Sequence, residues 1–162
     1  LKRCLLVDRF PLANSEKELV VINLHLDAYE SGEGRVAQTK ALLALMADEY
    51  AAGNYCIAGG DFNQLFPDTK AIYPIKNTEL WTPGGLTTDL LPDEWQFAFD
   101  TSTPSCRLLN QPYDPEDPTT QYFVIDGFIL TPNVTVDNVQ TVDLGFANSD
   151  HNPVTLAFTL KP

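Results

Sequence analysis

The chain has 162 residues, of which 44% are hydrophobic and 20% are charged. This length is enough for one domain with one hydrophobic core, and the composition excludes a disordered or a fibrous protein. The formal net charge is -12, which disfavours DNA or RNA as a partner because nucleic-acid-binding surfaces are usually basic. No apolar run approaches the roughly 20 residues of a membrane-spanning helix.

The three cysteines, Cys4, Cys56 and Cys106, lie far apart in the sequence. Their odd number permits at most one disulfide, and their spacing does not match a metal site. Cys4 and Cys56 lie in apolar runs, so we expect each to be a buried free thiol.

A hairpin and a helix are predicted in the first third of the chain. Residues 3–10 and 17–24 are apolar runs separated by turn-forming residues, which predicts two antiparallel strands. From Glu33 to about Ala52 apolar residues recur at helical spacing, and Gly53 follows as a stop, which predicts an amphipathic helix that packs on a sheet. The predicted apolar face contains Val36, Leu43, Met46, Ala47 and Tyr50.

The rest of the chain is predicted to be strands around a long irregular region. A strand from Tyr55 to Gly60 directly follows the helix, and this β-α-β order implies a parallel crossover. The region from Gln64 to about Thr120 holds eight of the twelve prolines, and one strand pair is expected in it, between residues 94–100 and 105–110. Such a region forms either the wall of a functional site or a rigid surface insertion. Further strands are predicted at residues 122–130, 134–144 and 153–160.

Polar and ionisable residues stand where four of the apolar runs end. Buried charges are costly unless they are paired or metal-bound, so these residues are candidates for a functional site. Each stretch alone has a structural alternative: a turn, a helix cap, a core histidine or a locally hydrogen-bonded carboxylate. The candidates are His25 in "NLHL", Asp61 and Asn63 in "GGDFNQ", Asp126 in "VIDGFIL", and Asp150 and His151 in "NSDHNPV".

The stretch "GGDFN" places an acid and an amide directly after two glycines. Glycine lets the backbone turn tightly and allows a ligand to approach. If the strand continues, Asp61 and Asn63 point to one side and Phe62 points into the core. A carboxylate beside an amide suits a hydrated Mg²⁺ ion and a phosphoryl oxygen, because Mg²⁺ takes few carboxylates and keeps several waters.

The four stretches, in this order and with a helix between the first two, resemble the endonuclease/exonuclease/phosphatase superfamily, which has the deoxyribonuclease I-like fold. The resemblance runs from about Lys17 to the end of the chain. It implies an α/β (α+β) fold, in which a mixed sheet with a helix packed outside forms part of a four-layer α/β/β/α sandwich. The family pattern also has an upstream half, whose asparagine and metal-binding glutamate have no counterpart here. Residues 1–162 are therefore expected to be one partial domain, its C-terminal portion.

The resemblance implies that water hydrolyses a phosphomonoester or phosphodiester, with Mg²⁺ or Mn²⁺ as the cofactor. Asp150, Asp61 and Asn63 are the residues implied at the metal. Asp61 would also orient or deprotonate the attacking water, and Asn63 would hold a phosphoryl oxygen. The other implied catalytic residues are His151 at the scissile phosphate, Asp126 polarising that histidine, and His25 at the leaving group.

The acidic charge favours a small phosphorylated metabolite or a lipid head group over nucleic acid, with Trp81, Trp95 and Arg107 supplying the substrate pocket. Without the upstream glutamate, the isolated chain is expected to bind metal weakly, to turn over little substrate, and to self-associate through an uncovered apolar sheet face. The alternative, from another class of function, is a non-catalytic binding module that retains the fold and uses the same cleft to hold a ligand or a partner protein.

Overall fold

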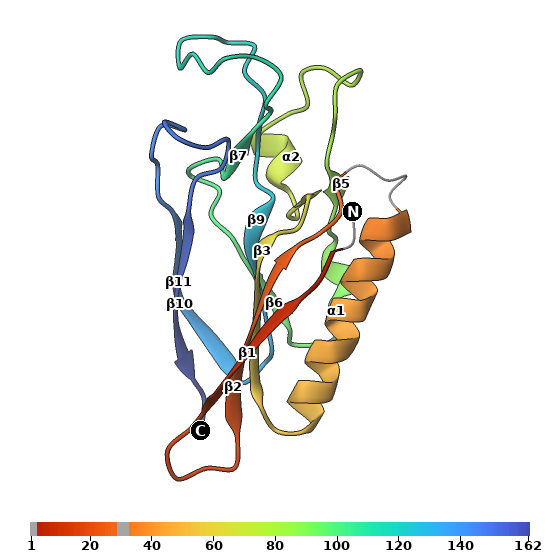
Figure 1. Cartoon of the computed structure of the whole chain (residues 1–162), viewed down its shortest axis with the longest axis vertical. Helices are drawn as coiled ribbons and strands as arrows, with labels where there is room; N and C mark the ends of the chain where they lie inside the picture. The colour runs from red at the N-terminus through yellow and green to blue at the C-terminus, as the bar shows by residue number, and fades with distance from the viewer. Residues whose placement is uncertain (1–2, 29–32) are drawn as a thin grey trace.

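A computed structural model, which describes residues 3–28 and 33–162, has a five-stranded mixed sheet at its centre. The strands of this sheet are β1 (Leu6–Pro11), β2 (Glu18–His25), β3 (Tyr55–Asp61), β9 (Asp126–Leu130) and β6 (Gln96–Ala98). Their order across the sheet is β1-β2-β3-β9-β6 (Figure 1). β1 and β2 form the antiparallel hairpin that the sequence predicts.

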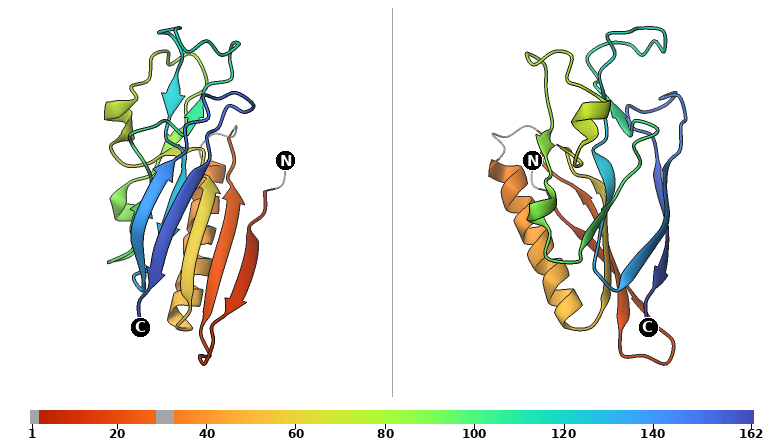
Figure 2. Two further views of the ribbon diagram at one scale, coloured as in Figure 1. Left: turned by 90° about the vertical axis from the view of Figure 1, so that its left-hand side faces the viewer. Right: turned by 180° about the vertical axis from the view of Figure 1, so that it is seen from behind.

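The helix α1 (Glu33–Ala51) connects β2 to β3 and covers one face of the sheet (Figure 2). β2 and β3 are parallel, with Leu19 opposite Tyr55 at one end and His25 opposite Asp61 at the other. The predicted β-α-β crossover is therefore confirmed. Because parallel strands end at the same edge of a sheet, the last residues of β2 and β3 meet there.

The buried face of α1 differs from the predicted one. Of the predicted residues, only Met46 is fully buried, and Val36 is 47% exposed. Polar residues shift the pattern, because Thr39 accepts a hydrogen bond from Gln64 and Glu49 pairs with an arginine of β1. Polar side chains with such partners can be buried, so an apolar pattern alone misplaces the face. The buried residues of the helix are Thr39, Leu42, Met46 and Glu49.

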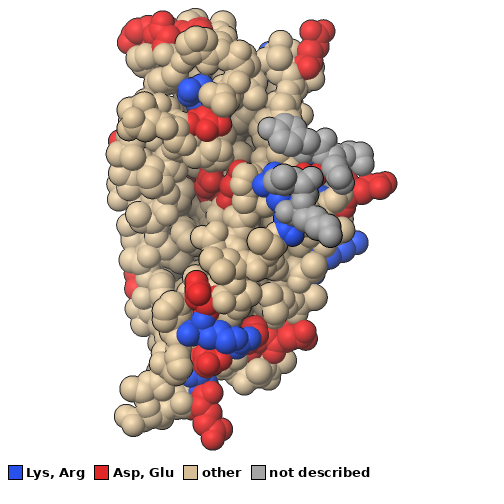
Figure 3. All heavy atoms as spheres, viewed as in Figure 1, with Lys and Arg blue, Asp and Glu red and all other residues tan. Residues whose placement is uncertain are grey.

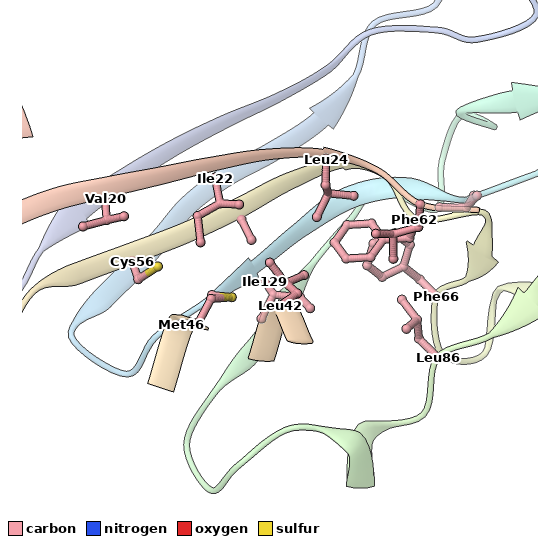
Figure 4. Packing of buried hydrophobic residues seen from close by; sticks show 13 residues of the cluster. Val20, Ile22, Leu24, Leu42, Met46, Cys56, Phe62, Phe66, Leu86 and Ile129 are labelled. Carbon is pink, nitrogen blue, oxygen red and sulfur yellow. The ribbon is translucent and has the colours of Figure 1, made fainter. Parts of the chain in front are cut away.

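The main core lies between α1 and the sheet (Figure 4). Val20, Ile22 and Leu24 are buried at alternate positions of β2, because successive side chains of a strand point to opposite faces. Met46 of α1 belongs to the same cluster, and Phe62, directly after β3, is fully buried, as the stretch "GGDFN" predicts. The other residues labelled in Figure 4 are Leu42, Cys56, Phe66, Leu86 and Ile129.

A two-stranded antiparallel ribbon, β10 (Val134–Thr141) and β11 (Val154–Leu160), packs on the other face of the sheet (Figure 2). A second apolar cluster lies between sheet and ribbon, in which Tyr55, Ile57 and Leu130 meet apolar residues of the ribbon. Helix, sheet and ribbon thus form three successive layers. The predicted α/β class, with a mixed sheet and a helix packed outside, is confirmed.

The predicted irregular region contains only short elements. The strand pair predicted within it is wrong, and so is the single strand predicted after it. Besides β6, these elements are β4 (Gln64–Leu65), α2 (Thr69–Ile72), β5 (Gly84–Gly85), η1 (Thr88–Leu90) and β7 (Cys106–Arg107), and β8 (Tyr122–Phe123) follows the region. β6 pairs with β9 and β7 pairs with β8, so residues 94–100 and 105–110 do not pair with each other. The predicted strand 122–130 is divided, because the carbonyl groups of Val124 and Ile125 bond to the backbone that follows β3.

All three cysteines are free thiols. Cys56 is buried in the sheet, as predicted, but Cys4 is exposed. Cys4 precedes the first strand, so its apolar neighbours do not enclose it. Within residues 3–28 and 33–162, no helix is long and apolar enough to cross a membrane.

Candidate active site

The register of the sheet brings three predicted site residues into one row. His25 is the last residue of β2 and lies opposite Asp61, the last residue of β3. Asp61 in turn lies opposite Asp126, the first residue of β9. Because neighbouring strands are about 5 Å apart, the three residues stand side by side at one edge of the sheet.

His151 reaches this row from the loop between β10 and β11. Its Nδ1 lies 2.9 Å from Oδ2 of Asp126, and its Nε2 lies 3.9 Å from Oδ2 of Asp61. The Nε2 atom of His25 approaches the same Asp61 oxygen to 3.4 Å. A β-bridge between Cys106 and His151 fixes the loop in this position. The fold therefore brings both predicted histidines close to the carboxylates of Asp61 and Asp126.

Ser105, which the sequence did not indicate, holds Asp126 in place. Its hydroxyl donates to Asp126 Oδ2 at 2.7 Å and accepts hydrogen bonds at 3.1 Å from the backbone N–H groups of Ile125 and Asp126. Ser105 is fully buried. It belongs to no glycine, acid or histidine motif, and only the pairing of β7 with β8 brings it to the site, so sequence patterns give no sign of its role.

Asn63 supports Asp61 instead of extending the strand. β3 ends at Asp61, and Asn63 has a φ of 50°, a left-handed conformation that asparagine tolerates. The backbone N–H of Asn63 donates to Asp61 Oδ1 at 2.8 Å, and its Nδ2 donates to Leu26 O at 2.9 Å and to Asp61 Oδ2 at 3.2 Å. Both amide hydrogens are used within the protein, so this geometry suits fixing the carboxylate better than holding a phosphoryl oxygen.

The two glycines before Asp61 let β3 run between closely spaced neighbours. Gly60 has a φ of 141°, and a Cβ atom there would lie 2.0 Å from the carbonyl oxygen of Leu24. A Cβ atom at Gly59 would lie 2.4 Å from the ring of Phe128. A side chain at position 60 would push against the backbone of β2, and one at position 59 would displace the Phe128 ring, so these glycines keep the row of site residues narrow.

The charges of the site influence one another. Burial and the neighbouring carboxylate of Asp126 raise the pKa of Asp61. Burial by itself lowers the pKa of His151, but the hydrogen bond with Asp126 and the contact with Cys106 outweigh it and raise that pKa well above the ordinary value. His151 is therefore a cation at neutral pH, and its charge lies between two carboxylates.

Asp61, Asp126 and His151 form a group that could hold a divalent cation. Each offers one ligand atom, and these atoms lie within 4.8 Å of one another. Carboxylate oxygens suit Mg²⁺ or Mn²⁺, and since His151 Nδ1 is engaged by Asp126, the two aspartates are the better ligands. Asp150, implied at the metal by the resemblance, is not in this group. It lines the same cleft, and its backbone carbonyl accepts a hydrogen bond from Arg107 at 2.9 Å.

A cleft of about 570 Å³ opens beside this group and is lined by Asp61, His151 and His25. Trp81 and Arg107, expected at a substrate pocket, both line it. The Trp81 indole is fixed by a hydrogen bond of 2.7 Å from its Nε1 to the carbonyl of Ala28. The expectation for Trp95 is wrong, because it packs edge-on against Tyr50 of α1, with ring centroids 6.2 Å apart, on the helix side of the sheet.

No family model and no curated protein matches the sequence. Solved structures do match it. TDP2 from D. rerio, complexed with a single-strand DNA product, matches 97% of this chain with a TM-score of 0.63 and 16% identity. An endonuclease/exonuclease/phosphatase from Beutenbergia cavernae matches 99% with a TM-score of 0.58 and 19% identity. A mannosyl-6-phosphatase from Bacteroides thetaiotaomicron matches 98% with a TM-score of 0.60 and 17% identity.

The chain therefore has the fold of the endonuclease/exonuclease/phosphatase superfamily, the deoxyribonuclease I-like fold. The motifs around the four candidate stretches predicted this fold. The same alignments cover 62%, 40% and 57% of the lengths of the three matched proteins, in the order given above. The chain thus spans less than two thirds of each of them.

Proposed function

We propose that the chain carries the catalytic residues of a hydrolase that uses water and a divalent cation, Mg²⁺ or Mn²⁺, to cleave a phosphomonoester or phosphodiester. The observation that carries this proposal is the row of His25, Asp61 and Asp126, with His151 bound to the last of them. A base, a cationic donor and two neighbouring carboxylates are the groups that phosphoryl transfer to water needs. The fold supports the proposal, since one matched protein is a mannosyl-6-phosphatase.

Asp61 positions the attacking water and accepts its proton. The hydrogen bonds from Asn63, at 2.8 and 3.2 Å, hold both carboxylate oxygens in a fixed direction. Burial and the charge of Asp126 raise the pKa of Asp61, and a carboxylate with a raised pKa is a stronger base.

His151 stabilises the negative charge that develops on the phosphoryl oxygens. Its Nδ1 is engaged by Asp126, whereas its Nε2 is 3.9 Å from Asp61 Oδ2, which is too long for a hydrogen bond. The Nε2–H group is therefore available to donate to the substrate. Asp126 keeps the ring protonated and oriented, and Ser105 keeps Asp126 in place.

His25 and a bound cation complete the proposed site. The His25 side chain is 56% exposed at the end of the row, where it can donate a proton to a departing alcohol. A divalent cation held by the carboxylates of Asp61 and Asp126, with Asp150 nearby in the cleft, would offset charge on the phosphoryl oxygens and lower the pKa of water. Asn63 acts through Asp61 by fixing its carboxylate.

The proposed substrate is a small phosphorylated metabolite or a lipid head group. The cleft of about 570 Å³ is of a size that suits a small molecule. The net charge of -12 opposes a polyanionic strand, and on the face in Figure 3 basic side chains form small separate groups and no stripe. TDP2 was solved with a DNA product, so an oligonucleotide belongs among the substrates tested.

In this proposal the chain is the C-terminal portion of a larger catalytic domain. Its alignments cover 40% to 62% of the three matched proteins named above. A second cavity of about 550 Å³, lined by Val21 and Phe128 among others, lies between the sheet and the loop that follows β10. Chain beyond these residues would supply a further metal ligand and cover apolar surface. Residues 1–162 alone would then turn over little substrate and self-associate.

The test measures hydrolysis of phenyl phosphate, bis(4-nitrophenyl) phosphate and a single-stranded oligonucleotide, with and without Mg²⁺ or Mn²⁺. The protein includes any natural sequence that precedes Leu1. We expect cation-dependent hydrolysis of one of the small esters. Asp61→Asn should reduce it by roughly 100-fold or more, whereas Asp48→Asn, an exposed position of α1, should leave it unchanged.

The other outcomes each decide a part of the proposal. Hydrolysis of the oligonucleotide in preference to both small esters would overturn the substrate preference. Hydrolysis that Asp61→Asn does not affect would exclude the proposed site. No hydrolysis of any of the three compounds by the folded protein would contradict the enzyme and favour the non-catalytic binding module.

A further inference from the structure

The cleft contains a buried arginine that no described carboxylate neutralises. Arg107 is 8% exposed, and no Asp or Glu in the described ranges forms an ion pair with it. Its Nη1 reaches only the carbonyl groups of Leu108 and Gln111, both at a long 3.4 Å. Its Nε is buried and has no hydrogen-bond partner. A buried guanidinium in this state is costly unless a ligand completes its hydrogen bonds.

The surroundings of Arg107 hold its side chain in a defined place. The guanidinium lies over the ring of Tyr113, 5.1 Å from its centroid, which is a cation–π contact. Tyr113 meets Phe146 edge-on, and Phe146 stacks on Tyr122. This aromatic cluster joins the loop after β7 to the loop that carries His151, so the guanidinium is positioned before any ligand arrives.

Arg107 is also tied directly to the proposed site. Its backbone N–H donates to the carbonyl of Asp150 at 2.9 Å, and its neighbour Cys106 forms the β-bridge with His151. Asp61 and His151 line the same cleft as Arg107. The guanidinium, however, contacts the 108–113 loop and lies outside the group formed by the two aspartates and the histidine.

A second arginine of the cleft is in a similar state. Arg3 lines the same cavity, and its Nε is also buried without a hydrogen-bond partner. In the described ranges, four buried side-chain polar atoms have no partner, and two of them are these arginine nitrogens. Since the chain has only 10 Lys and Arg residues against 22 Asp and Glu, two incompletely bonded arginines in one cleft indicate that it receives negative charge.

We propose that Arg107 binds a second acidic group of the substrate, a carboxylate or an additional phosphate, while the scissile phosphate lies at Asp61 and His151. The inference rests on the proposed phosphoesterase and narrows its substrate to a phosphoester whose alcohol carries another anion. A planar guanidinium binds two oxygens of such a group side by side. The apolar wall formed by Trp81, Leu108 and Leu109 suits an apolar or aromatic spacer between the two anions.

The experiment compares kcat/KM for phenyl phosphate, 3-carboxyphenyl phosphate and 1,3-phenylene bisphosphate, which differ only in the second group. The wild-type protein should prefer a doubly acidic compound, and the better of the two shows whether carboxylate or phosphate is the ligand. Arg107→Met keeps an aliphatic chain against Tyr113 and should reduce the preference by about 10- to 100-fold. Lys70→Met removes one exposed positive charge from α2 and should not change the preference.

If Arg107→Met lowers kcat/KM equally for the singly and the doubly acidic compounds, the inference is overturned. Arg107 would then act on the scissile phosphate or on the fold. Absence of any preference in the wild type would overturn it as well. Arg107→Lys, which keeps the charge but loses the planar fork, should retain part of the preference and replaces Arg107→Met if that variant does not fold.

Binding separates this inference from the proposed reaction. Calorimetric titration with phenylphosphonate and 3-carboxyphenylphosphonate, which resist hydrolysis, measures the same preference without turnover. The wild type should bind 3-carboxyphenylphosphonate more tightly than phenylphosphonate, and Arg107→Met should abolish this difference. That result would support the role of Arg107 even if no ester is hydrolysed. If the esters are hydrolysed with equal kcat/KM and the phosphonates bind with equal affinity, the role of Arg107 is rejected. The proposed phosphoesterase activity would then still stand.

Discussion

His151 and Asp126 are joined by a hydrogen bond of 2.9 Å between Nδ1 and Oδ2, and the same carboxylate oxygen accepts the Ser105 hydroxyl at 2.7 Å. The three residues come from separate parts of the chain: the β10–β11 loop, the start of β9, and the segment before β7. One oxygen therefore fixes the imidazole, its loop and the strand end relative to one another.

Asp126→Asn should remove the charge that raises the pKa of His151. Because the folded-state pKa of His151 is raised, the imidazole is protonated at neutral pH, and the variant should lose that proton at a lower pH than the wild type. The alkaline limb of the rate profile should shift to lower pH, and kcat at neutral pH should fall roughly 100-fold. The chain has 2 histidines, so NMR titration can follow His151 directly. An unchanged titration would show that Asp126 does not control the ring.

Ser105→Ala should destabilise the protein through three lost hydrogen bonds. The backbone N–H groups of Ile125 and Asp126 and one carboxylate oxygen lose their buried partner, which costs about 1–3 kcal/mol of unfolding free energy. Ser102→Ala, at an exposed serine bonded to Asp100, should change the unfolding free energy by less than about 0.5 kcal/mol. Urea denaturation measures both, and equal values for the two variants would contradict the buried role of Ser105.

Gly60→Ala should be among the most damaging single substitutions in the chain. The new Cβ would lie 2.0 Å from the backbone of Leu24, at a φ of 141°, so either β2 or β3 must move. We expect a loss of about 2–4 kcal/mol or more. Gly85→Ala meets nothing within 4 Å and is the matched control. Thermal melting of both variants tests this, and a Gly60→Ala protein as stable as the control would disprove the close approach.

Glu49→Gln should weaken the attachment of α1 to the sheet in a pH-dependent way. The Glu49 carboxylate accepts hydrogen bonds from Arg9 and from Asn54 Nδ2, which lower its pKa below the ordinary 4.5 although burial opposes them. A lowered folded-state pKa means that the stabilisation is present above about pH 4.5 and is lost as the pH falls through the lowered value. At pH 7 the variant should melt roughly 2–4 °C below the wild type.

The control for this prediction is the pH series itself, together with Glu116→Gln at an exposed position. The difference in melting temperature between wild type and Glu49→Gln should shrink as the pH falls from 7 to 3. The Glu116→Gln difference should stay near zero throughout. A Glu49→Gln difference that persists unchanged at pH 3 would mean that the carboxylate charge is not what holds the helix.

The parts that sequence predicts well are those in which local pattern and long-range structure agree. The β2-α1-β3 unit follows from alternating apolar strands around a helix, and Phe62 is buried as predicted although the strand ends at Asp61. The motifs also identified His25 and His151, which the fold places at 3.4 and 3.9 Å from one carboxylate oxygen.

The parts that sequence misses depend on partners far along the chain. Ser105 is important only because β7 pairs with β8, and Trp95 lies on α1 because β6 joins β9 at the sheet edge. The buried face of α1 is displaced because Glu49 and Thr39 find polar partners outside the helix. No local periodicity encodes such pairings, and the lack of a hydrogen-bond partner for Arg107 Nε is likewise visible only in three dimensions.

The strand register that places Asp61 directly opposite Asp126 has a consequence for how position 61 evolves. Two carboxylates on paired strand positions repel each other, and the raised pKa of Asp61 means that its ionised form opposes folding as the pH rises through that value. A neutral residue at position 61 should raise the melting temperature at pH 7 while removing the proposed hydrolysis. Selection for thermal stability alone would therefore erase this acid, and its persistence in a lineage would be evidence of continued selection for the chemistry.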